Sequence, residues 1–239
     1  MKNYTELIGK YEGKTAIICG AGPSLYEVYM NKKVWEKINN GNQVIIICNS
    51  AILAFDWYLD AGNPDMKIWL SNDSLSKKWS WWELVKKANC IKIVRNSWLK
   101  YKKELKGFLF FSPRKTSEDI VDFEEQNLCY CSSLPSSLDL SLQLGCKSIF
   151  LLGADHSRSK DGKRYFWEYF NKKDQPRQIQ PAIPRFEVQA RSFKFNNMAY
   201  KALKKFAEYK KVNIYNCNPE SKVEVFDKIT IKELLKIWE

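Results

Sequence analysis

The chain has 239 residues, of which 45% are hydrophobic, enough to bury a substantial core in one large domain or two small ones. Its longest apolar runs, such as 44–48 and 149–152, are far shorter than the roughly 20 residues of a membrane span, and residues 1–11 lack the apolar centre of a signal peptide. A formal net charge of +12 favours a phosphate-bearing partner: a nucleotide, a nucleic acid or an anionic glycan. We expect a cytoplasmic protein without a membrane span, and the composition leaves its oligomeric state open.

Two further features of the composition bear on metal binding and on nucleic-acid binding. Seven cysteines accompany a single histidine, too few ligands for a zinc cluster, so the cysteines are expected to be reduced thiols. Lysine dominates the basic residues, whereas base readout in nucleic acids favours arginine forks. Specific nucleic-acid recognition is therefore the less favoured interpretation of the positive charge.

Apolar runs and helical patterns alternate along the chain. Short apolar runs typical of parallel strands occur at 14–19, 44–48, 67–70, 91–94, 108–111, 147–155 and 212–217. Helices are predicted at 26–38 with Ser24 as N-cap, at 76–88, at 134–144 before Gly145, at 200–211, and from the capping box of Thr230 and Glu233 to Trp238. This alternation predicts a single Rossmann-like α/β domain over residues 1–239, doubly wound, with a mostly parallel sheet and helices on both faces.

One long segment has no such periodicity. Residues 156–198 are rich in aromatic and basic side chains but follow neither a helical nor a strand pattern. Such a length without periodicity indicates either a functional lid or a disordered segment, and the aromatic side chains favour an ordered lid over the binding site.

Polar residues follow several of the predicted strands. In a doubly wound sheet the carboxyl ends of the strands form the ligand site, near the point where the strand order reverses. The segments that should meet there are 20–24, 48–50, 71–74, 153–156 and 131–137, the last of which precedes a helix. This convergence predicts a ligand site more strongly than any one motif does.

The glycine turn "GAGPS" at 20–24 has two interpretations. A dinucleotide fingerprint needs a third glycine, and a Walker loop needs a Gly-Lys-Ser/Thr, and neither is present. Gly20 and Gly22 would still let a phosphate approach the backbone, and Pro23-Ser24 can start a helix that favours an anion. A phosphate cradle and a tight structural turn both remain open.

Other side chains at these strand ends also have both a chemical and a structural interpretation. Asn49 and Asn72 suit ribose hydroxyls or phosphate oxygens, or else satisfy local backbone groups. Asp73 and Asp155 suit a divalent cation on a phosphate, or else cap helices. His156 lies where a general base is useful, and Tyr165 could close over a ligand or pack in the core.

Together these motifs resemble a known superfamily. "AIICGAGPSLYE", "CNSAIL", "SNDSL", "SSLPSSLDLSLQLGCKSIFLLGADHS" and "ALKKFAEYKKVNIYNCNPES" are similar, in order, to the MptE-like (6-hydroxymethylpterin diphosphokinase MptE-like) proteins and the related bacterial lipooligosaccharide sialyltransferases. The resemblance spans roughly residues 14–221.

The sialyltransferase resemblance implies a CMP-sugar donor bound without a metal or other cofactor. The nucleotide-binding residues that it implies, together with those at the strand ends, are Gly20, Gly22, Pro23, Ser24, Asn49, Asn72, Asp73, Ser132, Ser133 and Gly153. Tyr165 matches a tyrosine near the departing phosphate. That family's general-base histidine falls before the helix at 200, where this chain has none, and Tyr130 replaces an arginine.

The MptE-like resemblance rests on "GADHS" followed by "RYFWEYF" and implies different chemistry. The characterised archaeal branch moves diphosphate from ATP to a pterin alcohol with Mg²⁺, for which Asp73 and Asp155 would be the metal ligands. This chain lacks that branch's acidic "DLDG"-type run and keeps one aspartate in "SNDS".

The favoured expectation is a glycosyltransferase-like enzyme with a CMP-sugar type donor and a hydroxyl acceptor, such as a glycan or a pterin. His156 or Asp155 would deprotonate the acceptor, and Tyr165 or the lid cation Arg164 would stabilise the leaving charge. Alternatives are an ATP-dependent diphosphokinase of the 6-hydroxymethylpterin type with Mg²⁺, and a non-catalytic nucleotide- or nucleic-acid-binding module.

Overall fold

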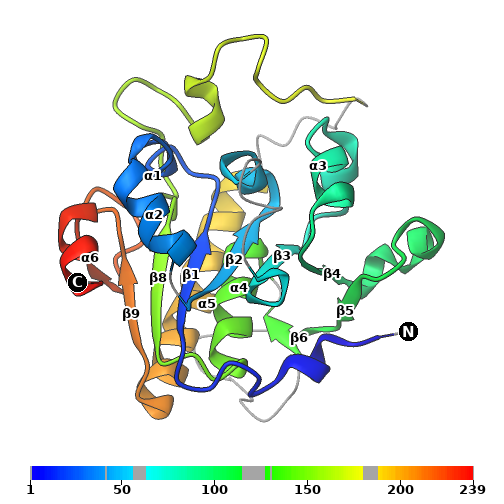
Figure 1. Ribbon diagram of the computed structural model, residues 1–239, viewed down its shortest axis with the longest axis horizontal. Coiled ribbons are helices and arrows are strands. Elements are labelled where there is room, and N and C mark those ends of the chain that lie inside the picture. The colour runs from blue at the N-terminus through cyan, green and yellow to red at the C-terminus, as the bar shows by residue number, and fades with distance from the viewer. Residues whose placement is uncertain are drawn as a thin grey trace.

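Eight strands form one parallel sheet at the centre of the protein (Figure 1). A computed structural model describes residues 2–40, 42–55, 63–114, 127–129, 131–179 and 188–238. The strand order is β10-β9-β8-β1-β2-β3-β4-β5, and each neighbouring pair is parallel. The strands are β1 (Thr15–Cys19), β2 (Val44–Cys48), β3 (Lys67–Ser71), β4 (Ile91–Arg95), β5 (Leu109–Phe111), β8 (Ser148–Leu152), β9 (Asn213–Asn216) and β10 (Asp227–Lys228). The predicted fold class is confirmed.

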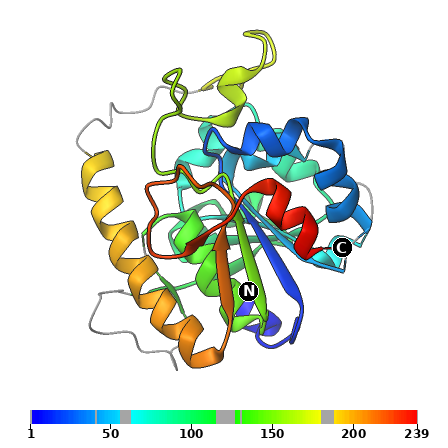
Figure 2. The same ribbon diagram turned by 90° about the vertical axis from the view of Figure 1, so that its left-hand side faces the viewer.

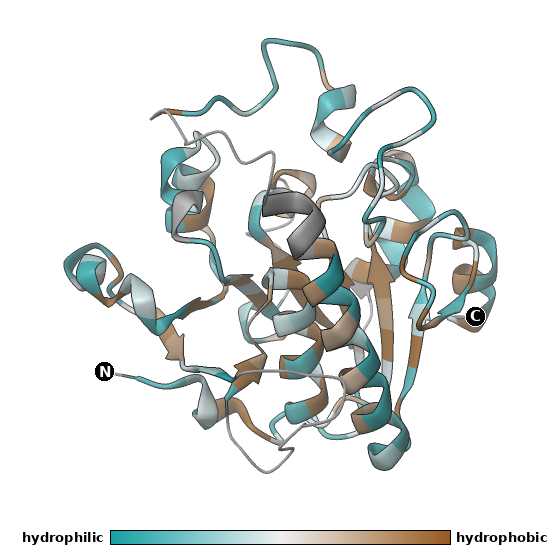
Figure 3. Ribbon diagram, turned by 180° about the vertical axis from the view of Figure 1, so that it is seen from behind, coloured by the Kyte–Doolittle hydropathy of each residue, from teal (hydrophilic) through white to brown (hydrophobic). Residues whose placement is uncertain are grey.

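Helices cover both faces of the sheet, because the strands are apolar on both sides. In β1, Ala16 and Ile18 pack into one core while Ile17 and Cys19 pack into the other. The first core lies under α4 (Ser133–Gln143) and α5 (Val188–Lys210). The second lies under α1 (Leu25–Met30), α2 (Lys32–Asn40), α3 (Trp82–Lys87) and α6 (Ile231–Ile237). Figure 2 shows these two layers on either side of the strands, and the central strands are largely brown in Figure 3.

The helix predicted at 26–38 is two helices, α1 and α2. Asn31 separates them with an extended backbone, and its side-chain and main-chain oxygens accept from the Val34 N–H at 3.4 and 3.1 Å. Asn31 therefore caps the second helix. Ser24 precedes α1 but makes no side-chain capping bond, because its hydroxyl donates to Asp155 instead.

Helix α5 begins at Val188 rather than at residue 200, so the end of the predicted lid is helical. The rest of the described lid, 156–179, is irregular apart from a 3-10 turn at Phe166–Tyr169. In Figure 1 this yellow-green segment lies beyond the carboxyl ends of the strands. Residues 180–187 of the predicted lid lie outside the described residues.

The remaining elements agree with the sequence in most respects. The capping box of Thr230 and Glu233 starts α6, and Gly145, with φ of 86°, follows α4. Helix α3 is shorter than the predicted segment, and Trp82 packs in the core as expected. A second parallel pair, β6 (Pro113–Arg114) with β7 (Leu128–Cys129), was not predicted, and neither was the edge strand β10.

The described part of the chain contains neither a disulfide bond nor a helix that could span a membrane. All seven cysteines lie in it, and all are free thiols. Within the same ranges, no helix has the length and apolar character needed to cross a lipid bilayer.

Candidate active site

A cavity of about 410 Å³ lies at the carboxyl ends of β1, β2 and β8. The strand order reverses here, because β2 to β5 lie on one side of β1 and β8 to β10 on the other. Such a crevice is where doubly wound sheets bind ligands. We call it the switch-point cavity, and its walls contain Gly20, Ala21, Gly22, Cys48, Asn49, Ser132, Ser133, Leu134, Gly153, Asp155, His156, Ser157, Arg158, Arg164, Tyr165, Phe193 and Asn196.

The glycines of this cavity allow two strand-end turns to pack against each other. A Cβ atom on Gly20 or on Gly22 would lie 2.6 Å from the Gly153 carbonyl oxygen, closer than atoms can approach. The Gly20 N–H donates to Leu152 O at 2.8 Å, and the Gly22 N–H donates to Gly153 O at 3.0 Å. These two amides are therefore used within the protein, and a phosphate in this cavity needs other donors.

Asp155 is a buried carboxylate at the end of β8, with 4% of its surface exposed. Ser24 donates to Oδ2 from its hydroxyl at 2.9 Å and from its N–H at 3.3 Å, and Asn218 Nδ2 donates to Oδ1. Burial raises the pKa of Asp155 to about 6, although the bonds from Ser24 and Asn218 act in the opposite direction. Asp155 is therefore ionised at neutral pH and more basic than an exposed aspartate.

His156 follows with a left-handed backbone, φ of 50°. Its Nε2 lies 2.8 Å from the Tyr200 hydroxyl, and its ring contacts the rings of Tyr200 and Phe193. Burial lowers the pKa of His156 to about 4. The imidazole is therefore neutral at physiological pH, and a base of such low pKa is poorly matched to proton abstraction there.

A hydrogen-bond network joins two strand ends to the start of α4. Ser133 Oγ donates to Asn49 Oδ1 at 3.1 Å and accepts from the Asn72 N–H at 2.9 Å. Asn49 is itself left-handed, with φ of 50°, a conformation that asparagine tolerates. This network aims the N-terminus of α4, with Ser132 as N-cap, into the cavity. The positive end of the helix dipole favours an anion there.

Four predicted nucleotide-binding residues do not line this cavity. Asn72 is buried and its Nδ2 donates to Ser136 Oγ at 2.9 Å, so it supports Ser133 from behind. Asp73 makes main-chain bonds with the Ser71 hydroxyl. Pro23 and Ser24 line a neighbouring cavity instead.

The predicted lid contributes Arg164 and Tyr165 to the wall. The Tyr165 ring stacks on Trp167 with centroids 5.0 Å apart, and the Arg164 guanidinium lies 5.2 Å from the Tyr165 ring. The segment is held against the strand ends, because the Phe166 N–H donates to Ala21 O at 3.2 Å and Trp167 Nε1 donates to Ser50 Oγ at 3.3 Å.

Sequence reasoning missed three notable members of the wall: Arg158, Phe193 and Asn196. Asn196 is 4% exposed, and its Oδ1 has no hydrogen-bond partner in the described ranges. It precedes Tyr200 by one helical turn, a spacing that would have placed it beside His156 had α5 been predicted from residue 188. Cys48 also lines the cavity, but burial raises the pKa of its thiol to about 12, so it is inert as a nucleophile.

A comparison with a solved structure supports the fold. The MAf glycosyltransferase from Magnetospirillum magneticum AMB-1 is similar over 93% of this chain and 34% of its own length, with 12% identity and a TM-score of 0.59. The sialyltransferase CstII from Campylobacter jejuni, solved with cytidine-5'-monophosphate, is similar over 92% of this chain and 86% of its own, with 17% identity and a TM-score of 0.49. CST-II with a trisaccharide acceptor and CMP gives 18% identity and the same TM-score over 91% and 86%. No protein-family model and no curated protein sequence matches the chain.

Proposed function

We propose that this protein is a transferase that moves a glycosyl group from a nucleotide-activated donor, of the CMP-sugar type, to a hydroxyl acceptor. The observation that carries the proposal is the switch-point cavity, where an anion-binding helix terminus and two arginines lie close to a basic carboxylate. Its volume of about 410 Å³ is within the usual range for small-molecule sites. The similarity to the MAf glycosyltransferase fold is consistent with this function.

The donor phosphate would bind at the start of α4. The first N–H groups of a helix have no partner within it, and here those of Ser133 and Leu134 belong to residues of the cavity wall. Arg164 adds a positive charge from the lid, and Tyr165 adds a phenol. When the bond from the anomeric carbon to the phosphate oxygen breaks, the leaving phosphate gains charge that these groups would stabilise.

Asp155 is the better candidate for the general base than His156. At neutral pH both groups are free of the proton, but the carboxylate, with a pKa of about 6, holds an incoming proton more tightly than an imidazole with a pKa of about 4. His156 would then act as a neutral wall of the site, oriented by Tyr200.

Diphosphate transfer from ATP is less well supported by the residues present. That chemistry needs Mg²⁺, for which Asp73 and Asp155 were the expected ligands, and Asp73 is not part of the cavity wall. In the described part of the chain no three histidine, cysteine or acidic side chains group closely enough to hold a metal ion.

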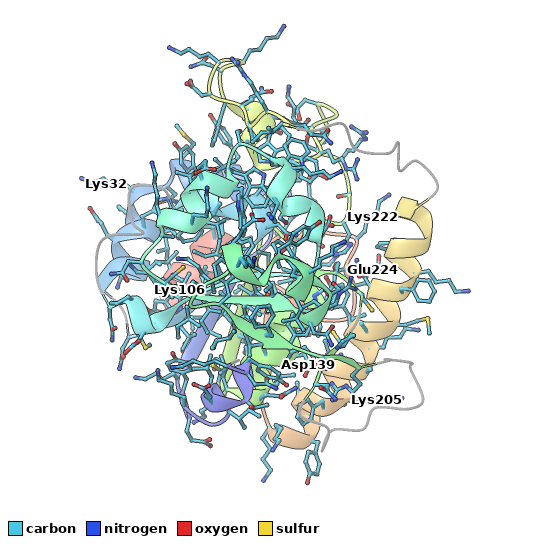
Figure 4. The ribbon with its side chains drawn as sticks, turned by 90° about the vertical axis from the view of Figure 1, so that its right-hand side faces the viewer. Lys32, Lys106, Asp139, Lys205, Lys222 and Glu224 are labelled. Atoms are coloured by element: carbon cyan, nitrogen blue, oxygen red, sulfur yellow. The ribbon has the colours of Figure 1, made fainter. Side chains whose placement is uncertain are left out.

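The positive charge does not by itself indicate a nucleic-acid-binding module. Of the lysines labelled in Figure 4, Lys32 lies on α2, Lys205 on α5, and Lys106 and Lys222 in loops, and the four lie apart from one another. Nucleic-acid binding is indicated by a stripe or patch of basic side chains rather than by net charge alone.

A thermal-shift panel of CMP, UDP, GDP and ATP, each with EDTA or with Mg²⁺, tests these functions. A nucleotide present at ten times its Kd adds about 1.4 kcal/mol to the free energy of unfolding, which raises the Tm by about 3 °C in a chain of this size. We expect CMP to give this shift with EDTA present. A response only to ATP with Mg²⁺ would support diphosphate transfer, and salt-sensitive RNA binding without any nucleotide response would support the module.

Two variants localise the effect. Arg164→Ala should weaken CMP binding by about tenfold or more, the usual effect of losing a charge-assisted hydrogen bond. Lys172→Ala removes an exposed cation from the same segment, outside the cavity, and should leave CMP binding unchanged.

A further inference from the structure

A second cavity, of about 790 Å³, lies next to the switch-point cavity on the side of β9. It is bounded by the start of α1, the segment that follows β8, the loop after β9 and the start of α6. Asp155, Ser157 and Arg158 line both cavities. The two cavities therefore meet at these residues, Asp155 among them.

The charges of the two cavities are opposite in character. Among the described residues of its wall, the switch-point cavity has Arg158 and Arg164 with one acid, Asp155. The second cavity has four carboxylates and two cations, namely Glu27, Asp155, Asp161 and Glu220 with Arg158 and Lys160. We call it the acidic cavity. Its charge disfavours a phosphate or a carboxylate ligand, so the two cavities would select different substrates.

The acidic cavity also has an aromatic wall with polar groups beside it. The rings of Tyr26 and Tyr169 stack with centroids 4.6 Å apart and planes at 21°. The Tyr169 hydroxyl donates to Asp161 Oδ1 at 2.8 Å, and Ser24 and Asn218 both donate to Asp155. An aromatic face beside carboxylate, amide and hydroxyl groups suits the C–H faces and hydroxyls of an uncharged sugar.

We propose that the acidic cavity is the acceptor subsite, that it takes a neutral polyhydroxyl acceptor, and that Asp155, between the two cavities, receives the proton of the attacking hydroxyl. The acceptor oxygen forms a bond to the donor's anomeric carbon while the bond from that carbon to the phosphate oxygen breaks. The phosphate leaves with the electron pair, and the hydroxyl proton goes to the Asp155 carboxylate. This assignment rests on the proposed transferase function.

The test is saccharide binding to the whole protein, measured by saturation-transfer NMR with and without CMP. The probes are lactose, which is neutral, and 3′-sialyllactose, which carries a carboxylate. We expect lactose to bind in both conditions without being displaced by CMP, and sialyllactose to bind at least fivefold more weakly. Tyr169→Ala should weaken lactose binding about tenfold and leave CMP binding unchanged. Tyr209→Ala, on the exposed side of α5, is the matched control and should change neither.

A second variant tests the subsite without changing the lid segment, so its result does not depend on whether that segment stays folded. Glu27 is exposed on α1 and lines the acidic cavity, so Glu27→Lys should fold normally and should improve sialyllactose binding relative to lactose. The subsite assignment is wrong if lactose does not bind the wild type, if CMP displaces it, or if Glu27→Lys leaves the preference unchanged. A failure of CMP to bind, with lactose binding intact, would instead refute the proposed donor and leave the saccharide subsite standing.

Discussion

Replacing Asp155 with asparagine should raise the stability of the protein relative to the wild type more at pH 8 than at pH 4, while removing its proposed activity. Burial raises the pKa of Asp155 from 3.8 to about 6, so the folded protein holds this proton more tightly than the unfolded chain. For an acid whose folded pKa is raised, stability is greatest while the group is protonated and falls as the pH rises from about 4 to above 6. Ionised Asp155 therefore costs the folded state about 3 kcal/mol at pH 8.

The magnitude follows from comparing one variant at two pH values. Asp155→Asn is neutral throughout, so the free energy of unfolding of the variant minus that of the wild type should increase by about 2–3 kcal/mol between pH 4 and pH 8. Changes in shape or in the bonds from Ser24 and Asn218 affect both pH values and largely cancel. At pH 8 this increase corresponds to a relative Tm gain of about 6 °C.

Guanidinium unfolding of both proteins at pH 4 and pH 8 measures this difference. An asparagine variant whose stability relative to the wild type is the same at both pH values would refute the argument that the carboxylate is held at a cost. Turnover of the donor sugar should fall at least a hundredfold in the same variant, since asparagine cannot accept the acceptor's proton.

Three further predictions concern other residues in or near the core. The His156→Gln variant should lose less stability than the wild type when the pH falls from 6.5 to 4. In the wild type the pKa of His156 is lowered to about 4 in the folded state, so over this range the unfolded chain takes up a proton on the histidine and the folded protein does not, which favours unfolding. Equal losses of unfolding free energy for the two proteins in urea titrations would contradict this. Gly22→Ala should destabilise the protein by about 2 kcal/mol or more, since its Cβ would clash with Gly153 O, and a Tm equal to the wild type's would show that the two turns can move apart. Asp139→Asn should cost about 3 kcal/mol at pH 8, because Asp139 Oδ2 accepts from Arg114 Nη2 and the Cys129 N–H inside the protein and the change removes the acid of this buried ion pair; a stabilised variant would contradict this.

The sheet could be predicted because its strands are locally encoded. Runs such as Val44–Cys48 are apolar at every position and end at polar residues. This pattern can be recognised in the sequence without knowing which strands lie beside each other in the sheet. The meeting of Gly20, Asn49, Ser133 and Asp155 around one cavity follows from the same pattern, since parallel strands end on one side of the sheet.

The roles of residues within the site depend on contacts between residues that are far apart in the chain, so the local sequence could not predict these roles. The amides of Gly20 and Gly22 are used because the turn after β8 packs against them, a contact between segments some 130 residues apart. The low pKa of His156 depends on its burial beside Tyr200 and Phe193, on a helix that begins earlier than its apolar pattern suggests. The acidic cavity joins parts of four segments that lie far apart in the chain, so no local pattern predicts that they meet.

A crystal structure with CMP bound tests the central claim most directly. We predict the phosphate at the N-terminus of α4, within hydrogen-bond distance of the Ser133 and Leu134 N–H groups and facing Arg164. A phosphate bound in the acidic cavity, or CMP bound anywhere outside the switch-point cavity, would contradict the account.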